Sequence, residues 1–71
     1  GVVAESMNAA GYSFIRVDEN GQSIWLAVPE TSIRIGQFIQ WQGGTQMRNF
    51  TSRSLNRVFD EIIFVGAVHE S

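Results

Sequence analysis

The residues best suited to chemistry lie in one stretch, residues 47–65, which contains three of the five arginines and three of the five phenylalanines. Guanidinium groups contact phosphate, and aromatic rings stack on bases, while asparagine amides bind polar edges. A stretch that combines these residue types predicts a binding surface. The predicted binding residues are Arg48, Asn49, Phe50, Arg53 and Arg57.

Two other interpretations of the arginines and aromatic residues stay open. Tyr12, Trp25 and Trp41 would extend the surface if their rings face outward, but tryptophans in so small a domain are most simply core residues. The arginines can also pair with acids such as Glu61. The net charge of −2 and the absence of lysine weigh against nucleic acid. We therefore keep nucleic acid as an alternative partner rather than the first.

Groups that could perform catalysis are few. His69 is the only histidine, and acid–base catalysis by histidine needs a positioned second group. Asp60 and Glu61 are neighbours in a predicted strand, so their side chains point to opposite faces and cannot share a proton. We expect no catalytic residues and a protein that is not an enzyme.

Ligands for a metal ion are equally scarce. The absence of cysteine excludes disulfides, thiolate metal sites and iron–sulfur clusters. The acidic residues are scattered rather than spaced as in a calcium loop. Met7 and Met47 are expected to fill the core or its rim, which leaves Met47 as a weak candidate ligand. We expect neither a metal nor a cofactor.

The length and composition predict a single domain over residues 1–71. A hydrophobic share of 44% is sufficient for one compact core. No apolar run approaches the roughly 20 residues of a membrane-spanning helix, so no membrane span is expected in this segment. The sequence begins at Gly1 rather than methionine, from which we expect an excised domain or a processed product.

The pattern of apolar residues and turns predicts short strands joined by tight turns. Asn20-Gly21 favours a type I′ hairpin turn between strands at 12–17 and 22–28, because both central residues must adopt positive φ. Apolar residues occur on both faces of these strands, which predicts that both faces are covered. The other predicted strands are residues 2–7, 37–41 and 60–68.

The segment 47–59 fits two descriptions. Leu55, Val58 and Phe59 have the spacing of one helical face, and Ser52 is placed to cap such a turn. An asparagine and several serines and threonines favour irregular structure instead. We expect mainly irregular chain, with at most one helical turn.

Five short strands separated by turn signals predict an all-β fold, namely a small five-stranded OB-fold-like barrel. An SH3-like barrel is the alternative. A meander of three strands followed by two more favours the OB arrangement.

Four blocks of sequence carry a resemblance that covers nearly the whole chain. They are GYSFIRVD (residues 11–18), SIWLA (23–27), IGQFIQW (35–41) and NFTSRSLNRVFDEIIFV (49–65). Together they resemble a bacterial family of small domains labelled as related to NrfJ, which is associated with cytochrome c nitrite reductase clusters. The resemblance implies an OB-type fold and a periplasmic or otherwise exported location.

The chain departs from this family at one site. Members often carry a G-M-P-M run and a histidine after the N-F pair, a set that could bind a soft metal or haem. Here Met47 alone is kept of that set, and Thr51 stands in place of the histidine. The resemblance thus implies weak metal binding or none. It also implies that Leu55 and Phe59 plug the barrel, while Arg57 pairs with an acid.

From these observations we expect a non-enzymatic, OB-fold-like binding or assembly module of an exported bacterial protein. Its partner is expected to be a protein or a small ligand. Two alternatives are a single-stranded nucleic-acid-binding domain and a metal or haem accessory domain linked to respiratory cytochromes.

Overall fold

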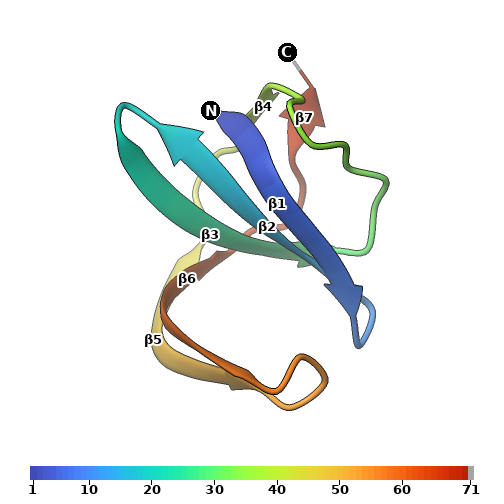
Figure 1. Ribbon diagram of the computed structural model, residues 1–71, viewed down its shortest axis with the longest axis vertical. Coiled ribbons are helices and arrows are strands. Elements are labelled where there is room, and N and C mark those ends of the chain that lie inside the picture. The colour runs from blue at the N-terminus through green and yellow to red at the C-terminus, as the bar shows by residue number, and fades with distance from the viewer. Residues whose placement is uncertain (71) are drawn as a thin grey trace.

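The computed structural model describes residues 1–70, and every regular element among them is a β-strand (Figure 1). The all-β prediction is confirmed. Five long strands form one sheet in the order β1-β2-β3-β6-β5, which does not close into a barrel, and two short strands form a separate ladder. The strands are β1 (Val2–Ala9), β2 (Tyr12–Glu19), β3 (Gln22–Pro29), β4 (Ile39–Gln40), β5 (Thr45–Ser52), β6 (Arg57–Phe64) and β7 (His69–Glu70).

Two tight turns connect β1, β2 and β3 into an antiparallel meander. Asn20 and Gly21 have φ angles of 52° and 78°, as a type I′ turn requires, so the predicted hairpin is confirmed. Ala10 and Gly11 repeat this geometry between β1 and β2, with φ angles of 53° and 80°. The meander is therefore built by turns that match the twist of its strands.

The meander buries residues on both of its faces, as the two-sided pattern predicted. On one face, a first core cluster forms beneath the segments that carry β4 and β7. On the other face, a second core cluster forms where the β5–β6 hairpin folds across the meander (Figure 1). The first core cluster contains Val3, Ile15, Val17, Leu26, Val28, Ile39 and Val65, and the second contains Phe14, Ala27, Phe59 and Ile62.

The second half of the chain corrects several predicted boundaries. Residues 47–52, expected to be irregular, belong to β5 and pair with β6 in an antiparallel hairpin. The predicted final strand at 60–68 is shifted toward the N-terminus and is β6. The predicted strand at 37–41 is reduced to the two residues of β4.

Residues 53–56 form the turn of this hairpin instead of a helical turn. The Asn56 N–H donates to the Arg53 carbonyl at 3.1 Å, and the Leu55 N–H donates to the Ser52 hydroxyl at 3.3 Å. A helix would have placed Val58 beside Phe59 in the core. In the strand, neighbouring side chains alternate between faces, so Val58 is 59% exposed and Phe59 is 2% exposed.

The meander and the hairpin are joined by a short parallel contact between β3 and β6. Only Leu26 with Ile63 and Ala27 with Phe64 are paired there. The Val65 N–H extends this contact by donating to the Ala27 carbonyl at 3.0 Å. Most of the remaining contact between the two parts must therefore come from side chains.

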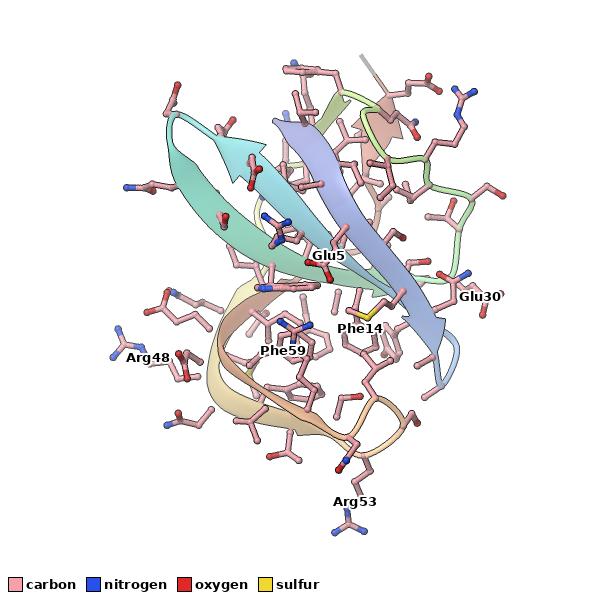
Figure 2. The ribbon with its side chains drawn as sticks, in the orientation of Figure 1. Glu5, Phe14, Glu30, Arg48, Arg53 and Phe59 are labelled. Carbon is pink, nitrogen blue, oxygen red and sulfur yellow. The ribbon has the colours of Figure 1, made fainter. Side chains whose placement is uncertain are left out.

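Six aromatic residues, here called the aromatic cluster, connect the meander with the hairpin. The Phe14 and Phe59 rings are stacked with centroids 5.7 Å apart, and both lie between the two parts in Figure 2. The Trp25 ring meets Phe59 edge-on at 4.9 Å. Aromatic pairs of this kind add about 0.5–1.5 kcal/mol each beyond the area that they bury. The cluster consists of Tyr12, Phe14, Trp25, Phe50, Phe59 and Phe64.

At Asn49, the β5–β6 hairpin switches which of its two faces is turned toward the core. In β6 the buried residues Phe59 and Ile62 are three positions apart, whereas a regular strand buries every second residue. Across the hairpin, Arg48 pairs with Glu61 and Phe50 pairs with Phe59, and Asn49 between them has a φ of 53°. This left-handed conformation interrupts the regular pleat of the strand and so resets the alternation.

Replacing Asn49 by valine should therefore destabilise the protein, because β-branched residues disfavour the left-handed conformation. We expect a loss of about 1–2 kcal/mol in the free energy of unfolding, measured by urea denaturation. Asn49→Gly removes the same amide but tolerates positive φ, and it should change that free energy by less than about 0.5 kcal/mol. Equal losses in both variants would mean that the amide, not the backbone conformation, is what matters.

Candidate functional site

The five predicted binding residues all lie on the β5–β6 hairpin, but they do not share one role. The Phe50 ring is partly buried in the aromatic cluster, 5.1 Å from Phe64, so it supports the core. Asn49 shapes the backbone, as described above. The Arg48 and Arg53 side chains point away from the body of the molecule (Figure 2). The predicted surface is thus reduced mainly to its arginines.

Arg57 makes the most specific contact of the three hairpin arginines. Its guanidinium carbon lies 4.5 Å from the centroid of the Trp25 ring and 5.0 Å from that of Phe59. This is cation–π geometry, worth about 0.5–1 kcal/mol at an exposed position. The expected ion pair between Arg57 and an acid is not formed within residues 1–70. Arg57 instead packs its guanidinium group on the Trp25 ring.

The arginines outside the hairpin are paired with carboxylates. Arg16 contacts Glu5 and Asp18, each at 3.0 Å, and Arg34 lies 3.6 Å from Glu70. These pairs are partly or fully exposed, so each contributes little stability. They nevertheless partly neutralise the positive charge of both side chains.

The hairpin arginines differ, because within residues 1–70 none of them forms an ion pair. Glu61, the partner of Arg48 in the ladder, accepts a hydrogen bond from the Gln46 amide at 3.1 Å instead. The hairpin carries three arginines and two acids, whereas the rest of the chain carries two arginines and five acids. The hairpin is therefore a positively charged region of an acidic protein.

A second site lies at the opposite side of the meander, where sequence reasoning identified none. A surface cavity of about 560 Å³ is lined by Trp41 and its neighbours Gln40 and Gln42, together with Glu19 and His69. The sequence predicts Trp41 to be a strand residue in the core or, as the alternative, an outward-facing ring that extends the arginine surface. The available signal was the Gln-Trp-Gln sequence, in which an aromatic ring is flanked by two amides.

Met47, the weak candidate for a metal ligand, and His69, the single histidine, are placed in different sheets. Met47 lies in β5 of the five-stranded sheet, and His69 lies in the short ladder. Within residues 1–70, no three histidine, aspartate or glutamate side chains gather as a metal site would require. The same residues contain no helix of the length and apolarity needed to span a membrane.

Comparisons with protein-family models, with curated proteins and with solved structures gave no match. A function for this chain therefore has to be inferred from the geometry of its own residues.

Proposed function

We propose that the domain is a non-enzymatic binding module that holds an anionic partner through Arg48, Arg53 and Arg57. The observation that carries this proposal is the contrast in pairing between the two groups of arginines. Those outside the hairpin contact carboxylates, while those on the hairpin have no acidic partner within residues 1–70. A cation without an internal partner keeps its full attraction for an external anion.

We also propose that the fold is an open variant of the OB barrel. Three features support this: a three-stranded meander, a parallel contact between its third strand and β6, and a final antiparallel hairpin. In the OB fold, the loops after the first and fourth strands flank the binding face. The corresponding segments here are the turn at Ala10 and Gly11 and the hairpin turn that carries Arg53.

Single-stranded nucleic acid is a second candidate partner, favoured by the contact between Arg57 and Trp25. A guanidinium plane over an indole forms a flat surface on which a base can stack. Arg53 at the hairpin turn would then contact the phosphate backbone. This candidate uses the same residues as the general proposal and differs in requiring bases.

The resemblance to the NrfJ-related family supports a further proposal, that the domain belongs to an exported bacterial protein. Met47 and His69 lie in different sheets, so their placement does not favour a metal or haem partner.

Arg53→Ala should weaken the binding of an anionic polymer about three- to tenfold, because it removes one charge–charge contact. The measurement is a fluorescence anisotropy titration with a labelled single-stranded oligonucleotide and, separately, with labelled polyglutamate. Arg34→Ala is the matched control, since it removes an equal, highly exposed charge from a different part of the molecule. It should leave the affinity almost unchanged.

The outcomes of these titrations separate the candidates. Binding of the oligonucleotide alone favours single-stranded nucleic acid, and binding of both polymers favours a general anionic partner. The slope of log affinity against log salt should fall by about one unit in Arg53→Ala. If neither polymer binds at low salt, or if Arg34→Ala weakens binding as much as Arg53→Ala, the hairpin is not the binding site.

A further inference from the structure

The cavity around Trp41 is separate from the hairpin arginines and has a different chemical character. Its lining combines the rings of Trp41 and Phe38 with the amides of Gln40 and Gln42. Its volume of about 560 Å³ falls within the range of roughly 300–1,000 Å³ that small-ligand sites occupy.

The aromatic part of the cavity is held in place by the core. Trp41 is partly buried and packs against the first core cluster. Its neighbour Ile39 is fully buried in that cluster, and Gln40 pairs with His69 in the ladder of β4 and β7. Since these contacts already fix the Trp41 backbone, a ligand would lose little free energy in ordering the site.

The charged groups that line the cavity offset each other, so they favour neither an anion nor a cation. No arginine lines it, and the Glu19 carboxylate lies 3.6 Å from the Gly1 ammonium group in the same lining. The two glutamine amides each offer two N–H donors and a carbonyl acceptor, the mixture that neutral hydroxyl groups require. The partly buried Trp41 ring beside them offers a flat apolar surface.

We propose that this cavity binds a neutral saccharide, with one pyranose ring packed on the Trp41 indole. The C–H face of a pyranose is apolar and flat, while its hydroxyls point outward in the ring plane. Gln40 and Gln42, which line the same cavity as Trp41, would bond those hydroxyls. The site is distinct from the arginines of the hairpin, so this proposal does not depend on the function proposed above.

Two-dimensional NMR of the ¹⁵N-labelled chain tests this proposal directly. The probes are cellotriose, maltotriose and N,N′,N″-triacetylchitotriose, with sorbitol as a polyol that has similar hydroxyls but no ring. At least one trisaccharide should shift the Trp41 indole N–H and the Gln40 and Gln42 amides in a saturable manner. The Trp25 indole, which lies in the aromatic cluster, should not move, and sorbitol should have no effect.

Variants assign the contacts that the titrations report. Trp41→Ala should abolish the saturable shifts, and Gln42→Ala, at an exposed position, should weaken the affinity about three- to tenfold. If Trp41→Ala does not fold, Gln42→Ala alone carries the test. The proposal is overturned if no trisaccharide produces saturable shifts at these three residues, if sorbitol produces the same shifts, or if Gln42→Ala binds as well as the parent chain.

Discussion

Phe59→Ala is expected to lower the free energy of unfolding by about 3–5 kcal/mol, the usual cost of removing a buried phenylalanine ring. A domain of this length has a total stability of roughly 4–10 kcal/mol, so the variant should be close to unfolding at room temperature. The reason is the position of Phe59 at the centre of the aromatic cluster. Its ring contacts both Phe14 and Trp25, and these contacts connect the hairpin with the meander.

Val58→Ala provides the control, because it truncates the neighbouring residue on the exposed face of β6. We expect it to cost less than about 1 kcal/mol, mainly through the lower strand propensity of alanine. Urea denaturation followed by circular dichroism measures both variants under the same conditions. If the two substitutions destabilise the protein equally, Val58 and Phe59 share a buried face, and residues 53–59 are helical after all.

Gly44→Ala is the second substitution with a large expected effect. It should lower the free energy of unfolding by about 3 kcal/mol or more. A Cβ atom at this position would lie 2.7 Å from methyl carbons of both Ile63 and Val65. The φ of Gly44 is also 112°, a conformation that side chains other than hydrogen rarely permit. Steric overlap and backbone strain therefore act together in this variant.

The adjacent glycine separates these two contributions. Gly43 has a φ of 65°, but a Cβ atom there would have no heavy atom within 4 Å. Gly43→Ala should therefore cost only about 1 kcal/mol, the strain of the left-handed backbone alone. Thermal unfolding of both variants is the measurement. Similar melting temperatures would show that the chain before β5 relaxes around the added methyl group.

The meander was predictable from the sequence because its signals are local. Asn20-Gly21 determines a turn whose two residues both need positive φ, and the strands on either side alternate regularly. The two-sided apolar pattern of residues 12–17 and 22–28 also indicated that both faces are covered. Neither signal depends on residues distant in the sequence.

Strand β5 was not predictable from the sequence, because it lacks local signals of this kind. It is an edge strand with a single partner, so it buries few side chains and carries almost no apolar alternation. Asn49 further interrupts the period of two. The residues after it then imitate a helical face, because Leu55, Val58 and Phe59 have helical spacing by coincidence.

The candidate site was predicted in part. The concentration of arginine in the hairpin is a property of composition, so the sequence alone revealed it. The contact between Arg57 and Trp25 joins residues that are distant in the sequence and depends on the way β6 meets β3. The cavity beside Trp41 likewise depends on the pairing of β4 with β7. Local patterns contain no information about such long-range pairings.

The brevity of the parallel contact between β3 and β6 has a consequence for how the chain folds. Each hairpin closes over a turn of a few residues, a step that takes microseconds for an isolated hairpin. Joining Leu26 to Ile63 instead closes a long loop and gains only two backbone pairs at once. The hairpins should thus form early, and their docking through the aromatic rings should limit the folding rate.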